Sequence, residues 1–294
     1  MVEKMNRCIH GKYTLDASGS GTATFSNTGS MGLTGSGART LTLTGSNNGS
    51  LATVIGDNGG ATALAKTGNG TWTLTGANTF TGNTTVSAGT LAANADGALG
   101  STAKVTINTG GTVLLGTTAG NNRIGDTTEV ALAGGTLNTG GFTETAGKMT
   151  LSGNSTLDFG AGTSRVTFDG VSSLGGSTLT VLNWTGVIGA AGGTDQLLFK
   201  NSSFTAGSTT SQVQFNIGGT LYNSIFLSVG ASTLELVPVP EPSTIFGASV
   251  LVIAVGWRER RRFGALRRKL PGRAALIPPL RINRTVVWRR GAAK

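Results

Sequence analysis

Short segments of the chain alternate between apolar and polar residues, and threonine fills many of the polar positions. The alternation is clear over residues 71–75, 105–108, 148–151 and 165–168. A period of two residues is typical of strands that bury one face. No window of residues 11–236 combines a helical apolar period with capping residues, so we expect short strands separated by turns. Glycine pairs such as Gly134-Gly135 fit those turns.

A short phrase recurs along the chain, made of a small residue, then threonine, then an aliphatic residue. Its aliphatic positions are Leu91, Val113, Leu137, Leu157 and Leu179. They are separated by 22, 24, 20 and 22 residues, and Leu221 follows 42 residues later, close to two more periods. Upstream, Leu51 and Leu74 are 23 residues apart, and Leu74 and Leu91 are 17 apart. A period of about 22 residues matches one coil of a parallel β-helix, whose apolar side chains stack on the next coil.

The sequence therefore predicts an all-β fold in which residues 13–236 form a parallel β-helix. Residues 1–12 precede it, and we expect them to be disordered. The alternative is an antiparallel β-sandwich or barrel, which also has short strands and turns. A sandwich does not require a constant spacing, so the repeat favours the solenoid.

Composition supports strands and marks where they end. The 294 residues include 48 Gly and 46 Thr, which suit turns and pleated strands respectively. All six prolines lie after residue 237, and their absence upstream suits continuous strand ladders. Residues 237–244 read as a stiff, proline-rich linker, and residues 245–257 as a short apolar helix. A basic tail, residues 258–294, follows.

The apolar run is 13 residues long, a length that a buried core segment could also have. Two features favour a membrane anchor, because a Trp at the interface and an adjacent Arg cluster are typical of membrane segments. The residues expected to contact lipid are Ile245, Phe246, Val250, Leu251, Val252, Ile253, Val255 and Trp257. The residues expected to set topology are Arg258, Arg260, Arg261 and Arg262. The same rule places the solenoid on the far side of the membrane.

The formal net charge of +10 belongs to the tail alone. Residues 1–257 contain 10 Lys and Arg against 12 Asp and Glu, whereas residues 258–294 contain 13 against one. A nucleic-acid-binding body would carry its own basic stripe, so we expect no nucleic-acid partner.

Few residues could support catalysis or hold a cofactor. The acidic side chains of the body are scattered, and His10 and Cys8 are each the single residue of their type. A metal site or an acid–base pair needs several such groups together, so we expect no catalytic, cofactor-binding or metal-binding residues. Parallel β-helices also include polysaccharide lyases and hydrolases, and a polysaccharide-active enzyme is kept as an alternative.

Residues 64–94 resemble the autotransporter-associated β-strand repeat, on the run from Leu64-Ala65-Lys66-Thr67-Gly68 to Ala88-Gly89-Thr90-Leu91. The resemblance implies a right-handed parallel β-helix of the passenger type. Lys66 and the glycines would then mark turns. The side chains that would fill the core are Trp72, Leu74, Phe80, Val86 and Leu91.

Residues 240–262 resemble the PEP-CTERM sorting signal, with Pro240-Glu241-Pro242, an apolar helix and the Arg cluster. Residues 182–186 and 193–197 resemble the coils that often precede this signal. The resemblance implies export, a transient stay in the inner membrane through residues 245–257, and cleavage near the Pro-Glu-Pro motif by an exosortase. Residues 1–15 contain no apolar run, so export is inferred from the C-terminal signal.

These observations predict a non-enzymatic structural or adhesive protein of a Gram-negative cell surface or extracellular matrix. Its expected partners are an exosortase-type processing enzyme, which would read Pro240, Glu241 and Pro242, the membrane and exopolysaccharide. Besides the polysaccharide-active enzyme, a fragment of an autotransporter passenger remains an alternative.

Overall fold

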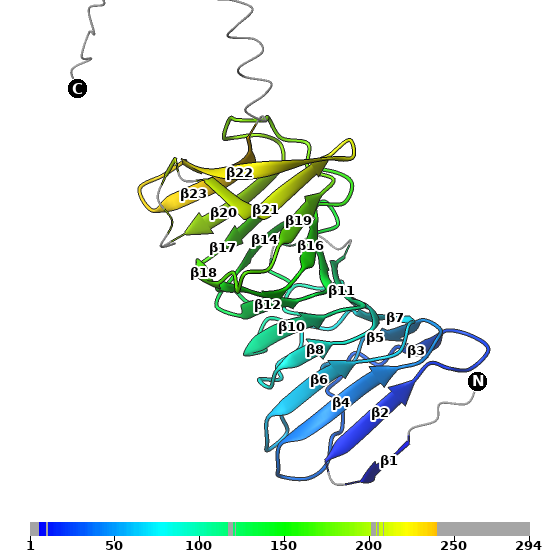
Figure 1. Ribbon diagram of the computed structural model, residues 1–294. Coiled ribbons are helices and arrows are strands. Elements are labelled where there is room, and N and C mark those ends of the chain that lie inside the picture. The colour runs from blue at the N-terminus through cyan, green and yellow to red at the C-terminus, as the bar shows by residue number, and fades with distance from the viewer. Residues whose placement is uncertain are drawn as a thin grey trace, which may run out of the picture. The chain divides into compact units, whose positions relative to one another are not determined.

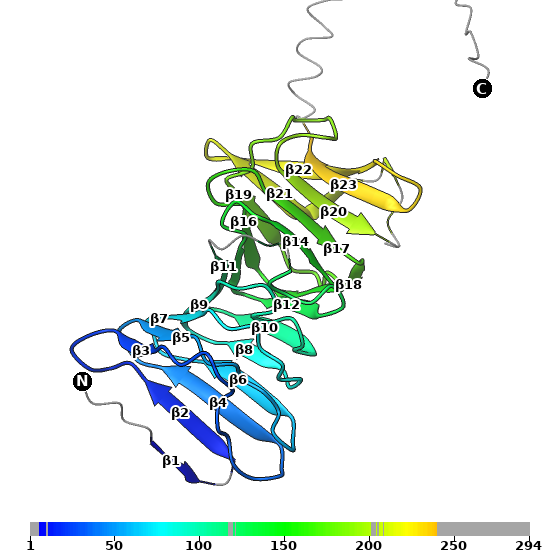
Figure 2. The same cartoon turned by 180° about the vertical axis from the view of Figure 1, so that it is seen from behind.

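The computed structural model describes residues 6–9, 11–116, 120, 122–200, 204, 206–207 and 209–239, which belong to one compact unit. The described part contains 23 strands and no helix. Most strands pair in parallel with strands one coil away in the sequence, which confirms the all-β parallel solenoid. Figure 1 shows the strands succeeding one another from blue to yellow, and Figure 2 shows the same succession from behind.

One face of the solenoid is a nine-stranded sheet. Its strands, in spatial order, are β1 (Asn6–Ile9), β2 (Lys12–Asp16), β4 (Arg39–Thr44), β6 (Thr62–Lys66), β8 (Thr84–Val86), β10 (Lys104–Asn108), β12 (Glu129–Ala133), β15 (Met149–Gly153) and β18 (Val171–Ser173). The pairs from β2 to β18 are parallel, whereas β1 is antiparallel to β2. β1 lies within residues 1–12, for which the sequence predicted no regular structure.

The second face is a parallel ladder in which every strand except the last follows a strand of the first face along the chain. It consists of β3 (Ala23–Phe25), β5 (Gly49–Leu51), β7 (Thr71–Leu74), β9 (Gly89–Ala93), β11 (Gly111–Leu115), β13 (Thr136–Asn138), β16 (Ser155–Asp158), β19 (Leu179–Leu182) and β21 (Thr209–Ile217). Each coil up to the one with β18 and β19 therefore contributes one strand to each of these two faces.

The third face consists of loops in the earlier coils and of strands in the later coils. In the later coils it is a parallel ladder of β14 (Thr143–Ala146), β17 (Arg165–Phe168) and β20 (Gln196–Lys200). In the earlier coils loops take its place, joined by isolated parallel bridges such as Leu99 with Ile124. The regular backbone ladder is thus missing there, and other groups must satisfy the backbone N–H groups.

The last strands close the solenoid instead of extending it. β22 (Thr220–Ser228) is antiparallel to both β21 and β23 (Thr233–Pro238), and β23 is antiparallel to β20. The β22–β23 pair therefore joins the second face to the third. The prediction of parallel coils up to residue 236 is wrong here because Gly218 and Gly219, at φ of 60° and 86°, form a tight turn. A tight turn gives an antiparallel hairpin, whereas parallel strands need a longer crossover.

The pairing register of the second face confirms that many of the recurring aliphatic positions lie opposite one another in adjacent coils. Leu91 pairs with Val113, Val113 with Leu137, and Leu137 with Leu157. Upstream, Leu51 pairs with Leu74, also as the spacing predicted. These aliphatic side chains are buried and stack along one continuous core.

The repeat is misaligned at three other places. Leu157 pairs with Val181, and Leu179 lies opposite Ser155. Leu91 pairs with Trp72 instead of Leu74. Leu221 is not in this ladder at all, because it lies on β22 and is 47% exposed. The coil length therefore varies more than the recurring phrase suggested.

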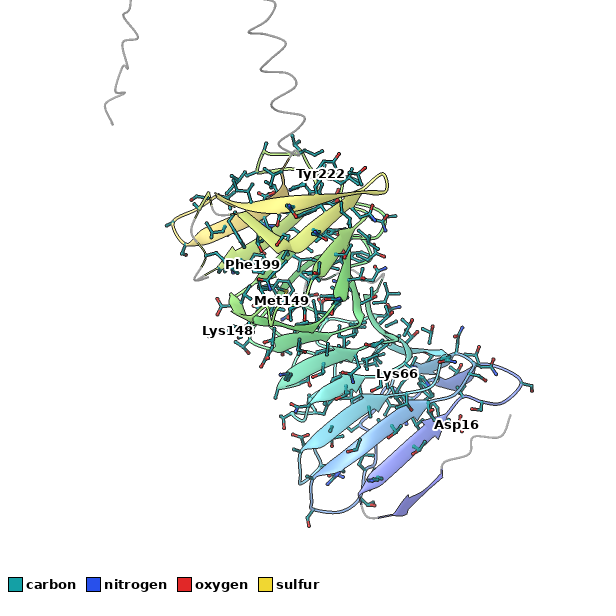
Figure 3. All side chains as sticks on the ribbon, viewed as in Figure 1. Asp16, Lys66, Lys148, Met149, Phe199 and Tyr222 are labelled. Carbon is teal, nitrogen blue, oxygen red and sulfur yellow. The ribbon has the colours of Figure 1, made fainter. Side chains whose placement is uncertain are left out.

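The five core side chains expected from the resemblance are all buried, which confirms that expectation; they are Trp72, Leu74, Phe80, Val86 and Leu91. The indole Nε1 of Trp72 donates a hydrogen bond to the Thr44 carbonyl at 2.8 Å. Towards the end of the solenoid, aromatic rings replace aliphatic chains, with Phe168, Phe199 and Phe226 in successive ring contacts. Figure 3 shows the side chains along the ribbon, including the buried Met149 and Phe199.

Candidate functional site

The residues predicted to act as a site lie outside the described residues. These are the motif Pro240, Glu241 and Pro242, the apolar run 245–257 and the basic cluster 258–262. Their roles stay predictions. Within the described residues, the structure contains no helix that could cross a membrane.

The described residues also contain no group of three or more His, Cys, Asp or Glu side chains that could hold a metal ion. Their most unusual polar groups are instead charged side chains inside the solenoid. Three of these side chains lie at positions where the sequence predicted no buried charge: Lys66, and the pair of Arg123 with Glu144.

Lys66 is the last residue of β6, and its side chain is fully buried. Its Nζ donates hydrogen bonds to the carbonyl oxygens of Thr67, Gly68 and Ala88, at 2.9, 2.8 and 2.9 Å. Lys66 does border a turn, as the resemblance implied, but its side chain points into the core. Burial lowers the pKa of Lys66 to about 8. The ammonium group thus ties two successive coils together from inside.

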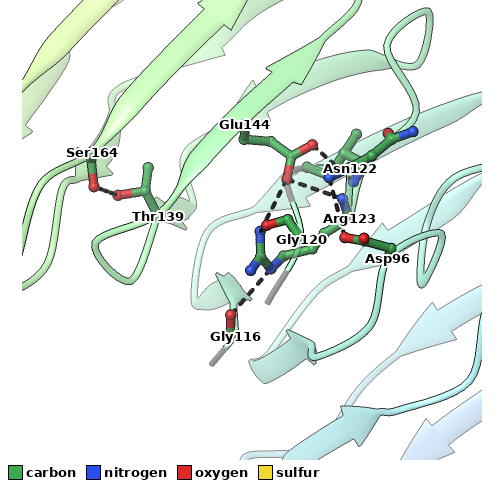
Figure 4. Close-up of polar contacts among 9 residues, drawn as sticks. Asp96, Gly116, Gly120, Asn122, Arg123, Thr139, Glu144 and Ser164 are labelled. Carbon is green, nitrogen blue, oxygen red and sulfur yellow. Dashed lines mark hydrogen bonds and ion pairs between the residues drawn. The ribbon is translucent and has the colours of Figure 1, made fainter. Parts of the chain in front are cut away.

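Arg123 and Glu144 lie on the third face, and both are buried (Figure 4). The Glu144 carboxylate accepts the backbone N–H groups of Arg123 and Ile124, at 3.1 and 3.3 Å. The Arg123 guanidinium donates to the carbonyls of Gly116 and Gly120, and it lies 4.6 Å from the centre of the Phe142 ring. Burial raises the pKa of Glu144 to about 8, and the backbone N–H groups and Arg123 oppose that rise.

A second polar contact in the same region joins Thr139 to Ser164, whose hydroxyl oxygens are 2.7 Å apart. Both hydroxyl oxygens also lie 2.9 Å from the Phe159 carbonyl oxygen. Because each hydroxyl has one proton, one of them donates to this carbonyl and the other donates to its neighbouring hydroxyl. Figure 4 further shows Asp96, which accepts the Asn122 backbone N–H at 3.3 Å.

Side-chain acceptors thus recur on the third face, where the backbone ladder is incomplete. Asn78 accepts the N–H of Ile55 at 2.8 Å and donates to the Ala98 carbonyl at 2.8 Å. In a later coil, Asp195 accepts the N–H of Ser164 at 2.7 Å. Each of these side chains supplies a link between coils that a strand would otherwise make. These groups stabilise the solenoid and are not exposed to a substrate.

These buried polar side chains were not predicted from the sequence, although the period of the strands contained an indication of them. Leu64 and Lys66 are two residues apart on one strand, so they point to the same face. Glu144 and Ala146 stand in the same relation on β14, and both are buried. A charged residue at a position that the strand alternation assigns to the core therefore indicates a buried charge.

The outer surface of the second face carries one ordered feature. Six threonines stand in register on successive coils, each with its side chain half-buried; they are Thr71, Thr90, Thr112, Thr136, Thr156 and Thr180. Neighbouring strands in a sheet are about 4.8 Å apart, so the row presents hydroxyl groups at that interval. We call it the threonine row.

Comparison with known proteins finds two similarities. Residues 64–93 match the model of the passenger-associated-transport-repeat family, and they span β6 to β9. Over 117 residues, 38% of this chain, the sequence is 36% identical to "Adhesin BmaC autotransporter" from Brucella suis biovar 1 (strain 1330). The matched stretch spans 3% of that protein's length. No solved structure matches the chain. The described residues therefore form a parallel β-solenoid that contains a segment similar to the passenger-associated-transport repeat.

Proposed function

We propose that this chain forms part of a surface-displayed adhesin-like protein of a Gram-negative bacterium, with a solenoid of the passenger type. The observation that carries the proposal is the placement of the repeat match. Residues 64–93 form two adjacent coils, and Trp72, Phe80 and Val86 from these coils are buried in the shared core. The similarity to an autotransporter adhesin supports the same function. The passenger alternative thus ranks ahead of the sorting-signal interpretation.

The adhesive surface in this proposal is the threonine row. A solenoid holds successive coils at a fixed spacing, so it presents an extended regular surface to a long ligand. Hydroxyl groups both donate and accept hydrogen bonds, which suits the hydroxyl-rich surface of a polysaccharide. We propose exopolysaccharide as the ligand class because the row is polar and carries no charge.

The test is an adhesion assay on cells that display the full chain. Replacing Thr112, Thr136 and Thr156 with valine keeps the shape of each side chain and removes three hydroxyl groups. We expect less retention of the cells on a surface coated with exopolysaccharide. The matched control replaces Thr85, Thr106 and Thr150, on the outer side of the first face, with valine.

Two results would count against the proposal. The first is a chain that resists proteinase added to intact cells and fractionates with the cytosol, because surface display would then be absent. The second is equal retention for both triple variants and the unchanged protein, because the threonine row would then make no adhesive contact.

We further propose a route to the surface for the segment after Val239. An exosortase-type enzyme would recognise Pro240, Glu241 and Pro242, while residues 245–257 hold the chain in the inner membrane. The support is the sequence itself, because prolines favour the extended backbone that a protease cleft binds. The Arg cluster after the apolar run favours retention of that end in the cytoplasm.

This route is tested by the size and location of Glu241→Ala in a host that contains an exosortase. We expect the variant to stay in the membrane fraction as an uncut chain, while Ser243→Ala is processed normally. If the unchanged protein and Glu241→Ala have the same size and location, the sorting proposal fails, and the adhesin proposal is unaffected.

A further inference from the structure

The exposed large apolar side chains of the described residues are confined to one end of the solenoid. They are Val187, Ile188, Leu221 and Val229, with exposed fractions of 58%, 38%, 47% and 42%. Figure 1 shows β21, β22 and β23 at the end opposite β1, and the described chain stops there at Val239. Before residue 187, the large apolar side chains of the described residues are buried or half-buried.

β22 is apolar on both of its faces. Phe226 points into the core and contacts the rings of Phe199 and Phe204. Successive residues of a strand point to opposite faces, so Leu221, Asn223, Ile225 and Leu227 share the outer face, and three of these four are apolar. Val229 directly follows the strand and is also exposed. A strand that ends a solenoid needs one apolar face, and the outer face of β22 is a second one.

The segment 186–194 lies on the same outer face and extends the apolar surface. The N–H of Gly189 donates to the Pro238 carbonyl at 2.9 Å, and the N–H of Gly192 donates to the Glu235 carboxylate at 2.8 Å. Glu235 pairs with Leu227 across the strands, so its side chain marks the outer side. The segment that carries Val187 and Ile188 is therefore held against the outer side of β23, the strand that pairs with β22. We call the surface formed by Val187, Ile188, Leu221 and Val229, together with Ile225 and Leu227, the cap surface.

Charge distinguishes this end as well. Between residues 170 and 239 the charged residues are Asp195, Lys200 and Glu235. Both acids are buried and Lys200 is exposed, so no carboxylate of the described residues in this range faces solvent. An apolar surface bordered by a lysine suits a bilayer with anionic headgroups, because lysine attracts them and exposed carboxylates would repel them.

We propose that the cap surface lies against a lipid membrane, so that the solenoid stands on the bilayer by its C-terminal end. The inference rests on the proposed membrane anchor, because the apolar run begins six residues after Val239 and the linker is therefore short. Six residues reach at most about 20 Å, which limits the distance between the cap surface and a proposed anchor that begins at Ile245.

The test uses the full chain reconstituted into vesicles of phosphatidylethanolamine and phosphatidylglycerol. Cys8→Ser removes the single native thiol, and single cysteines at Val187, Leu221 or Val229 then carry a nitroxide label. The control label replaces Thr24, which is exposed on β3 at the other end of the solenoid. Accessibility to oxygen, which concentrates in the bilayer, is compared with accessibility to a water-soluble nickel chelate. We expect reconstitution to shift the three cap labels towards oxygen and to leave the label at position 24 unchanged.

Each other result has a distinct meaning. If carbonate extraction removes the chain from the vesicles, the anchor proposal fails, and this inference fails with it. If the chain is retained but the cap labels stay as accessible to nickel as the control, this inference alone is overturned. Spin–spin broadening between copies, without a gain in oxygen accessibility, would mean that a second copy covers the surface and would overturn the lipid assignment.

Discussion

Glu144 accepts the backbone N–H of Arg123 at 3.1 Å, while the charged ends of the same two residues are 3.8 Å apart. The shorter contact is therefore to the backbone. The carboxyl group takes the place of a missing neighbouring strand, and the guanidinium favours its charged form but does not offset the effect of burial on its pKa. Two consequences of this arrangement can be measured.

Glu144→Ala is expected to lower the free energy of unfolding by about 1–3 kcal/mol for each of the two buried backbone N–H groups that lose their acceptor. Urea unfolding followed by circular dichroism measures the loss. The control is Glu129→Ala, which removes a partly exposed contact to Lys104 and is expected to cost less than about 1 kcal/mol. Equal losses for the two variants would contradict this role for Glu144.

The same carboxyl group should make stability depend on pH. Burial holds the pKa of Glu144 at about 8 in the folded chain, above its ordinary value of 4.5. Between these two values the folded state binds more protons than the unfolded state, so the free energy of unfolding falls as pH rises. Unfolding curves at pH 5, 6, 7 and 8 measure the slope. Glu144→Gln should flatten it, and an unchanged slope in that variant would refute the assignment.

Lys66 should produce the opposite slope at higher pH. Its pKa is lowered by burial to about 8 in the folded chain, from an ordinary value of 10.5. Between these values the unfolded state binds more protons, so the free energy of unfolding rises with pH, by up to about 3 kcal/mol. Lys66→Met should abolish the rise, whereas Lys148→Met, at an exposed position, should keep it. The rise would have another origin if both variants retained it.

Gly49 lies beneath Trp72 in the second face, and the two residues are register partners. A Cβ atom at position 49 would come within 2.5 Å of the indole ring. Gly49→Ala is therefore expected to cost about 1–3 kcal/mol through overpacking. Tryptophan fluorescence during thermal unfolding measures the change. Gly19→Ala is the control, because a Cβ there meets nothing within 4 Å, and equal unfolding midpoints would argue against the tight contact.

Asp195 fixes the start of the segment that carries Val187. Its carboxylate accepts the N–H groups of Ser164 and Thr185 and the Thr185 hydroxyl, at 2.7, 2.8 and 2.7 Å. Asp195→Ala should speed hydrogen exchange at these two amides and cost about 1–3 kcal/mol for each buried donor left unpaired. Asp16→Ala, which loses exposed contacts to Ser18, should change neither amide. Unaltered exchange in Asp195→Ala would show that the carboxylate does not hold this corner.

The repeat in the sequence predicted the solenoid because its aliphatic positions are also register partners over several coils. It failed at Leu179 for a physical reason. Leu179 and Val181 point to the same face, so a shift of two residues leaves the inside–outside pattern unchanged. Periodicity therefore identifies the face of a residue with more certainty than its partner. The turn at Gly218-Gly219 then ends the series of parallel strands. The spacing of aliphatic residues does not distinguish parallel from antiparallel pairing, so it could not predict this change.

The buried charges could not be predicted from residue type alone. Lysine and glutamate are usually exposed, and their burial at Lys66 and Glu144 depends on unpaired backbone groups that only the folded coils reveal. The Pro-Glu-Pro motif is a different case, because it lies beyond the described residues and stays a prediction. The sequence did contain one indication of these buried charges: Lys66 and Glu144 each lie two residues from a core position of the same strand.

The antiparallel β22–β23 pair has a consequence for growth of the stack. A parallel ladder that ends abruptly offers free N–H and C=O groups to any strand of matching length, including one from another molecule. At this end, two of the three faces are instead bonded to each other through β22 and β23. The pair thus acts as a terminator, because another copy of the chain cannot extend these two ladders at this end of the solenoid.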